Sequence, residues 1–204
     1  MQLKCNGIKE GKNGLGIVVY EGNVAGVFTQ NRFKSPSVVV TEEHIKNGFI
    51  EGIIANSGNA NAFTGKKGYR NAKRMCQLLA EKLKTDTENI AVASTGVIGE
   101  YLPMDKIEKG IELASKSLSS QGNTQASEAI LTTDRMIKTI ALETNIPGQG
   151  NKWVRIGAIA KGAGMIAPNL ATMLCFITSD ACITHDALKE ALQNAVNKSF
   201  NQIS

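Results

Sequence analysis

The sequence is poor in histidine, and this shortage excludes two common catalytic centres. Its two histidines, His44 and His185, lie far apart and have no cysteine or aspartate partner at ligand spacing. A histidine-built zinc site and a Ser-His-Asp triad are therefore excluded, and both histidines are expected on helix surfaces. If the chain is an enzyme, its general base is a group other than histidine, and no metal site is expected.

Cysteines and long apolar runs are also scarce. The four cysteines form no C-x-x-C pair, and their surroundings resemble strand or helix interiors, which fits a reducing compartment. No window approaches the roughly 18 apolar residues that a membrane span needs, and the N-terminus lacks the apolar region of a signal peptide. We therefore expect a cytoplasmic protein with no membrane contact.

The charge and composition favour a globular protein without a nucleic-acid partner. The formal net charge is +5, only 5% of the residues are aromatic, and 42% are hydrophobic, enough to fill a substantial core in 204 residues. The densest basic group carries no interleaved aromatic residues, so it is read as a solvated helix face. Its members are Lys66, Lys67, Arg70, Lys73 and Arg74.

Apolar, β-branched runs predict strands over much of the chain. These runs cover residues 15–20, 24–28, 38–40, 49–55, 90–93, 154–160 and 173–177. The turn residues 21–23 predict a hairpin between the first two runs, and residues 145–153 predict a hairpin loop before residue 154. Thr41 is expected to cap a short helix that ends at residues 47–48.

Amphipathic patterns predict three helices among these strands. The first begins near Gly68 and the second at Pro103, and the third begins near Thr184. Helices that alternate with strands in this way favour an α+β fold in which the helices cover sheet faces.

Three short polar stretches interrupt this pattern, and each has more than one interpretation. Residues 56–65, rich in asparagine and glycine, form either a self-satisfied turn or a polar wall of a small-molecule site. Residues 94–99 (STGVIG) suit an oxyanion hole, a phosphate cradle or a plain turn, although no known phosphate-loop pattern is present. Residues 132–134 (TTD) are typical of a helix cap or a strand end.

The most informative stretch spans residues 161–174 (KGAGMIAPNLATML). A strand delivers Lys161 to a loop of small residues and one proline, and the Ala171-Thr172 pair then precedes an apolar run. On this pattern alone, the stretch is either a turn that feeds a buried strand or a reactive centre at Thr172.

Taken together, these stretches resemble one family. Residues 56–62 (NSGNANA), 94–99, 132–134 and 161–174 are similar, in the same order, to the motifs of glutamate N-acetyltransferase, the ornithine acetyltransferase of arginine biosynthesis. Members of this self-cleaving family have an N-terminal threonine as nucleophile. The resemblance implies a layered α/β/β/α sandwich, and the family extends well past Ser204. Residues 1–204 are thus expected to form a single α+β domain that is truncated relative to the family.

The resemblance also implies a role for individual residues. Cleavage is expected between Ala171 and Thr172, so that residues 1–171 form an α chain and residues 172–204 begin a β chain. Thr172 would be the nucleophile, Thr95 and Gly96 the oxyanion hole, and Thr132, Lys161 and Thr172 the substrate-binding residues. Arg135 departs from the threonine expected after residues 132–134.

The implied reaction is the transfer of acetyl from N-acetylornithine to glutamate through acetyl-Thr172. The α-amine of a new N-terminus has a reference pKa of about 7.7–8.0 and could replace the missing histidine base. No cofactor is implied, although acetyl-CoA is a conceivable co-substrate for N-acetylglutamate synthesis. The cleaved fragment is the expected partner, in a heterotetramer of two α and two β chains. A self-processing aminopeptidase or amidohydrolase, and a non-catalytic binding module built on residues 94–99, stay open as alternatives.

Overall fold

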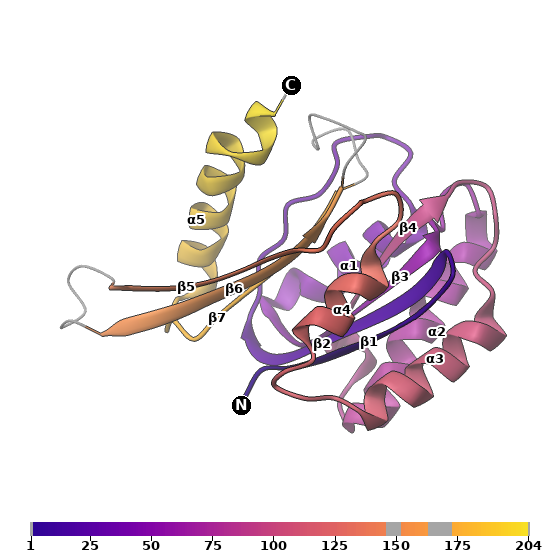
Figure 1. Ribbon diagram of the computed structural model, residues 1–204. Helices are drawn as coiled ribbons and strands as arrows, with labels where there is room; N and C mark the ends of the chain where they lie inside the picture. The colour runs from indigo at the N-terminus through magenta and orange to yellow at the C-terminus, as the bar shows by residue number, and fades with distance from the viewer. Residues whose placement is uncertain (1, 146–151, 163–172, 204) are drawn as a thin grey trace.

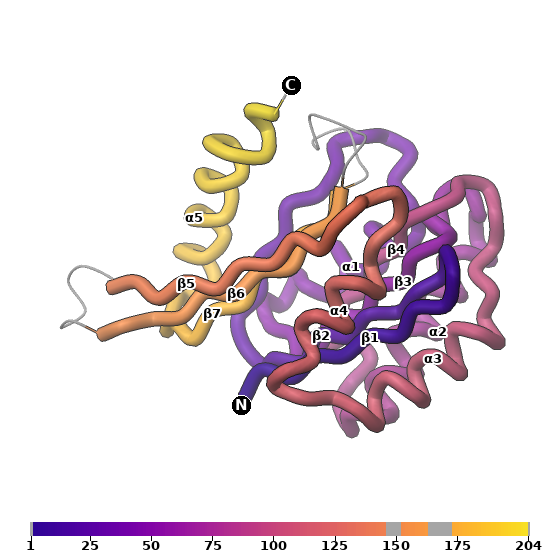
Figure 2. The backbone as a smooth tube through the Cα atoms, in the orientation of Figure 1, coloured from indigo at the N-terminus to yellow at the C-terminus, as the bar shows by residue number. Residues whose placement is uncertain are grey.

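Seven strands form two separate sheets in the computed structural model, which describes residues 2–145, 152–162 and 173–203 (Figures 1 and 2). The first sheet has the order β1-β2-β3-β4 and the second the order β5-β6-β7. The strands are β1 (Lys4–Glu10), β2 (Asn13–Asn23), β3 (Phe49–Asn59), β4 (Ile90–Val97), β5 (Lys138–Asn145), β6 (Trp153–Lys161) and β7 (Leu174–Ser179).

Five α-helices accompany the sheets in this part of the chain. They are α1 (Pro36–His44), α2 (Gly65–Leu83), α3 (Met104–Lys116), α4 (Asn123–Ile130) and α5 (His185–Lys198). Short 3-10 turns cover Ile45–Asn47, Thr87–Asn89 and Phe200–Gln202. None of the helices among the described residues is both long enough and apolar enough to cross a membrane.

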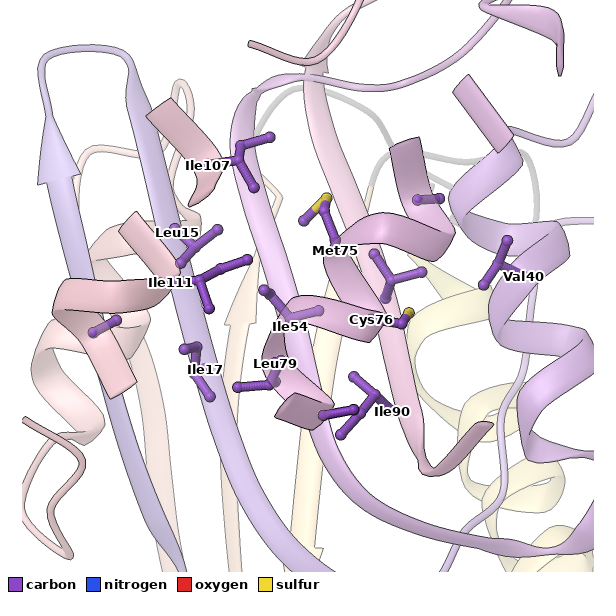
Figure 3. Close-up of a cluster of buried hydrophobic side chains, with 14 of the residues drawn as sticks. Leu15, Ile17, Val40, Ile54, Met75, Cys76, Leu79, Ile90, Ile107 and Ile111 are labelled. Atoms are coloured by element: carbon purple, nitrogen blue, oxygen red, sulfur yellow. The ribbon is translucent and has the colours of Figure 1, made fainter. Parts of the chain in front are cut away.

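The main core lies between one face of the first sheet and helices α1, α2 and α3 (Figure 3). Ile17 and Ile54 project from the sheet toward Met75 and Leu79 of α2 and toward Ile111 of α3. The predicted amphipathic helices at residues 68 and 103 are confirmed as α2 and α3. Because β3 and β4 are parallel, the chain needs a crossover between them, and α2 supplies it.

The opposite face of the first sheet packs against α4 and the second sheet. Val18 and Ala55 from the first sheet share a cluster with Ile130 of α4 and Ile159 of β6. Helices, first sheet and second sheet therefore follow one another in layers, and the predicted α+β class is confirmed. The second sheet extends to one side of this body (Figure 1), and every residue of β5 before Asn145 is exposed.

Two predicted strands near the N-terminus are wrong. Residues 38–40 lie in α1, because Ser35 caps the helix with its hydroxyl and Pro36 occupies the first helical turn. Residues 24–28 form no strand, because β2 continues through the predicted turn to Asn23, with a register shift before Gly22. The partners of β2 are therefore β1, which the sequence analysis did not predict, and β3.

The predictions for the later elements are mostly confirmed. Strands β5 and β6 are antiparallel with Asn145 opposite Trp153, as the expected hairpin requires, although loop residues 146–151 lie outside the described residues. The helix expected near Thr184 is α5, which buries no residue. The run 173–177 becomes β7 but is only partly buried, because β7 is an edge strand and Ile177 is 48% exposed.

Helix α1 covers the outer edge of β4 through a row of polar side chains. Thr41 Oγ1 accepts a hydrogen bond from the Val92 amide at 2.8 Å and donates to the Val92 carbonyl at 2.6 Å. His44 Nδ1 donates to the Ile90 carbonyl at 2.7 Å. An edge strand otherwise leaves such backbone groups without a partner.

The predictions for the Thr41 and His44 side chains are wrong. His44 is buried rather than on the surface, and Thr41 lies inside the helix rather than at its cap. The expected end of the helical segment at Gly48, with a φ of 78°, is confirmed.

Two glycines bring the carboxyl ends of β3 and β4 close together. Gly58 pairs with Gly96, with φ values of 107° and 134°. A Cβ on Gly96 would overlap the Gly58 carbonyl and lie 2.6 Å from the Asn59 amide nitrogen. Both strands therefore run further than predicted, and the expected loops at residues 56 and 94 begin inside the sheet.

We expect Thr41→Val to destabilise the fold by about 1–3 kcal/mol, because the substitution leaves two buried backbone groups of Val92 without a partner. Urea denaturation followed by circular dichroism measures this change. The control is Thr144→Val, which alters an exposed threonine on β5. Equal stabilities of the two variants would contradict the role assigned to Thr41.

We expect Gly96→Ala to cost about 3 kcal/mol or more, because the methyl group meets the β3 backbone and alanine is strained at this φ. The matched control is Gly99→Ala. Gly99 also has a positive φ, 85°, but nothing lies within 4 Å of the added atom, so only backbone strain of about 1–2 kcal/mol is expected. A similar loss in both variants, measured by urea unfolding, would rule out the steric explanation.

Candidate active site

Lys161 and Thr95 meet where the two sheets come together. Lys161 is the last residue of β6 and is only 2% exposed, and its Nζ donates a hydrogen bond to Thr95 Oγ1 at 2.8 Å. The ends of β4, β6 and the segment after α4 point toward the same region in Figure 2. Two residues that the sequence analysis selected, 66 positions apart, are thus brought into direct contact. Lys161 is therefore a buried charge rather than a lysine exposed to solvent.

The direction of this hydrogen bond determines what Thr95 can do next. An ammonium group carries hydrogens but no lone pair, so Thr95 Oγ1 is the acceptor. Its own hydrogen therefore remains to be donated to another group. The neighbouring Gly96 is exposed and sits where the strands end. The geometry accordingly allows Thr95 to donate one hydrogen bond in addition to the one that it accepts from Lys161.

Lys9 and Ser57 anchor the segment that carries Thr132. Lys9 Nζ donates to the hydroxyl oxygen of Ser57 at 2.9 Å and also to the carbonyl oxygen of Leu131. The Ser57 hydroxyl donates to the Ala129 carbonyl at 2.7 Å. These bonds hold the C-terminal end of α4, so Thr132 follows a helix rather than capping one and its side chain is exposed.

Sequence reasoning missed Lys9, for a physical reason. A lysine near the end of a strand carries no local signal, and its target, the Leu131 carbonyl, lies 122 residues away. Ser57 lay within the polar stretch 56–62 but was given no role. Its position opposite Thr95 in the parallel ladder becomes evident only once β3 and β4 are paired.

Asp134 lies next to Lys161 and was also missed. Its side chain is fully buried, and Oδ1 accepts hydrogen bonds from the Gly162 amide at 2.8 Å and from Lys138 Nζ at 2.5 Å. Burial alone would raise the pKa of Asp134, but the hydrogen bonds from Lys138 and Gly162 outweigh it and lower the pKa. Asp134 is therefore a carboxylate at neutral pH.

The site is electropositive, and this affects Lys161 itself. Burial lowers the pKa of Lys161, the Asp134 carboxylate opposes that shift, and the charges of Lys138 and Lys9 add to it. Three ammonium groups and one carboxylate thus gather around the end of β6. Such a surplus of positive charge suits a substrate that carries a carboxylate.

Ala171 and Thr172 lie outside the described residues, but the residues that flank their segment are placed. Lys161 pairs with Leu174 across β6 and β7. A Cβ on Gly162 would lie 3.6 Å from the Cα of Met173, so residues 162 and 173 are neighbours. Segment 163–172 therefore leaves from and returns to a point beside Lys161.

The asparagine-rich stretch 56–65 begins inside β3, which ends at Asn59, and residues 61–64 then satisfy polar groups of their own segment and of α2. Asn61 Nδ2 donates to the Gly68 carbonyl at 3.0 Å, and Thr64 Oγ1 donates to the Asn61 carbonyl at 3.1 Å. The first of the two interpretations is thereby supported for these residues.

Across the parts of the chain that the structure describes, no group of three or more histidine, cysteine, aspartate or glutamate side chains could hold a metal ion.

Comparison with known proteins identifies relatives over nearly the whole chain. The arginine biosynthesis bifunctional protein ArgJ of Archaeoglobus fulgidus is 47% identical and matches 98% of this chain and 51% of its own length. The glutamate N-acetyltransferase of Methanothermobacter thermautotrophicus is 48% identical, with 97% and 49% covered. The chain spans about half the length of these curated relatives.

Solved structures agree with this relationship. The arginine biosynthesis bifunctional protein argJ of Bacillus halodurans has a TM-score of 0.73 at 37% identity, with 85% of this chain and 91% of that chain covered. The ornithine acetyltransferase of Mycobacterium tuberculosis, solved in complex with ornithine, has a TM-score of 0.74 at 33% identity, with 84% and 92% covered. The family model that describes ArgJ proteins matches residues 1–204. By both sequence and architecture, the chain belongs to the ArgJ family.

Proposed function

We propose that the protein containing this chain transfers an acetyl group from N-acetylornithine to glutamate, in arginine biosynthesis. The observation that carries the proposal is the buried contact of Lys161 with Thr95, beside the two residues that flank segment 163–172. Relatives named glutamate N-acetyltransferase and a structural neighbour solved with ornithine support the choice of substrates.

The reaction begins with processing of the chain. Thr172 Oγ attacks the Ala171 carbonyl carbon, the acyl group moves from nitrogen to oxygen, and water hydrolyses the resulting ester. This step leaves Thr172 with a free α-amine that titrates near neutral pH and accepts the hydroxyl proton. The α-amine acts as the general base, because the sequence has no paired histidine for that role.

The acetyl group then travels in two steps. Thr172 Oγ attacks the acetyl carbon of N-acetylornithine, the carbon–nitrogen bond breaks, and ornithine leaves with the proton that the α-amine had accepted. The amine of glutamate next attacks the acetyl-threonine ester, which forms N-acetylglutamate and returns the hydroxyl. Each tetrahedral intermediate carries an oxyanion, which Thr95 and Gly96 stabilise.

Lys161 acts as a fixed cation in this scheme. Its ammonium is buried and donates to Thr95, so it supports the donor geometry of the oxyanion hole. Its positive charge and the exposed Thr132 together attract the carboxylate of the substrate. The two cleaved fragments stay together, in a heterotetramer of two α and two β chains, and acetyl-CoA is a second acetyl donor to be tested.

We expect Thr172→Ala in the intact polypeptide to remain one uncut band on a denaturing gel, because the attacking hydroxyl is absent. Thr172→Ser, which keeps a hydroxyl, is the control and should still yield two fragments. After incubation with N-acetylornithine, mass spectrometry of the wild type should find acetyl on the fragment that begins at Thr172. Cleavage of the alanine variant, or acetyl found only elsewhere, would sink the assignment.

We expect Thr95→Val to lower kcat by roughly 10²- to 10³-fold, the usual effect of losing one oxyanion-hole donor. Thr95→Ser keeps the hydroxyl and should retain most of the activity, which steady-state assays with N-acetylornithine and glutamate measure. A valine variant as active as the serine variant would exclude Thr95 from the oxyanion hole.

The same assays separate the rival functions. Free acetate released at an equal rate with and without glutamate would favour a hydrolase, because water would then resolve the acetyl-enzyme. Substrate binding without turnover, with the bond between Ala171 and Thr172 intact, would favour a binding module.

A further inference from the structure

We propose that Asp134 is a positioning residue of this site, whose buried carboxylate holds the backbone at Gly162 and keeps the Lys161 ammonium charged against Thr95. The proposal rests on the function proposed above, and it gives a role to Asp134, a member of the TTD stretch that had none. It concerns a residue that acts through Lys161 and Gly162 rather than one that touches the substrate.

The Asp134 carboxylate is a buried charge. Its side chain has no exposed surface, whereas its ion-pair partner Lys138 is 44% exposed. Surface ion pairs contribute little to stability, and a buried carboxylate is costly unless it is well satisfied. Here Oδ1 accepts two hydrogen bonds, but Oδ2 is buried without a hydrogen-bond partner among the described residues. A surface salt bridge alone therefore does not account for the placement of this charge.

The Asp134 carboxylate also binds the backbone of Gly162. Gly162 directly follows Lys161 and has a φ of 144°, a conformation that side-chain-bearing residues rarely adopt. Its amide donates to Asp134 Oδ1 at 2.8 Å. This bond holds the backbone at the point where β6 ends and segment 163–172 begins. It thereby helps to set the position of the Lys161 Cα.

Asp134 also balances the positive charge around Lys161. Lys161 is shut off from water, and Lys138 of β5 and Lys9 of β1, a strand of the other sheet, add like charge. Asp134, from the segment after α4, supplies the opposing negative charge. Without it, burial and the two neighbouring lysines would lower the pKa of Lys161 further. The ammonium would then lose its proton at a lower pH, and its ability to hold a carboxylate would be lost with it.

Hydrogen bonds at the end of α4 anchor the segment that carries Asp134. The segment that carries it starts at the end of α4, which Lys9 and Ser57 hold through the Leu131 and Ala129 carbonyls. Ser57 also pairs with Thr95 across β3 and β4. Asp134 and Thr95, which both act on Lys161, are therefore positioned by the same connected set of hydrogen bonds.

The decisive substitution is Asp134→Asn, because an asparagine oxygen can still accept the Gly162 hydrogen bond while the charge is removed. In protein labelled with ¹³C at lysine Cε, the Lys161 signal is assigned by its loss in Lys161→Arg and then titrated. We expect the pKa of Lys161 to be lower in Asp134→Asn than in the wild type. The opposite control is Lys138→Met, which removes a neighbouring positive charge and should raise that pKa.

Enzyme kinetics supply a second readout in the intact polypeptide. The alkaline limb of the pH profile of kcat/KM should move to lower pH in Asp134→Asn, with a tenfold loss of kcat/KM on that limb for each pH unit of the shift. Asp134→Glu, which keeps the charge, should restore part of the wild-type profile.

The two proposals fail in different ways. An unchanged Lys161 pKa in Asp134→Asn would overturn the role of Asp134, whether or not the enzyme is active. The wild type could fail to cleave itself and to transfer acetyl while Asp134→Asn still lowers the pKa of Lys161. That result would count against the proposed function alone.

Discussion

One buried hydrogen bond, from Lys161 Nζ to Thr95 Oγ1, joins the two sheets of this protein and organises the candidate site. Burying an ammonium group is costly, so the surrounding structure has to compensate for it. The compensation comes from the Thr95 hydroxyl and from the nearby Asp134 carboxylate. The first is supplied by the pairing of β3 with β4, and the second by the anchoring of the segment after α4. The site is thus a consequence of how four separate chain segments meet.

The surrounding polar contacts serve the same end. Helix α1 satisfies the outer backbone of β4 through Thr41 and His44, so this edge strand is held along the residues that precede Thr95. Gly58 and Gly96 allow the ends of β3 and β4 to approach more closely than side chains would permit. Stability and function are therefore linked, because the features that hold β4 in place also set the position of the proposed oxyanion hole.

Sequence reasoning succeeded where the pattern was local and periodic. The amphipathic spacing of α2 and α3, the hairpin connection before β6, and the α+β class were all predicted, although β5 itself was not. It failed for residues 38–40, where β-branched residues favoured a strand but Ser35 and Pro36 start a helix. It failed again for His44, since nothing near it in the sequence indicates the Ile90 carbonyl that it binds. Local propensity is overridden when packing or capping supplies a larger free energy.

The amino-acid sequence by itself determined the family, the residue types of the site and the absence of a paired histidine base. It singled out Lys161, Thr95 and Thr132, each of which lies in a separate motif of the family. Only the tertiary structure decided that Lys161 is buried against Thr95, that Lys9 and Ser57 hold the end of α4, and that the charge of Asp134 acts on the same ammonium. The physical reason is that burial, charge balance and hydrogen bonding depend on residues 28 to 122 positions apart. Such contacts leave no periodic trace in the chain, and they exist only once the two sheets have packed together.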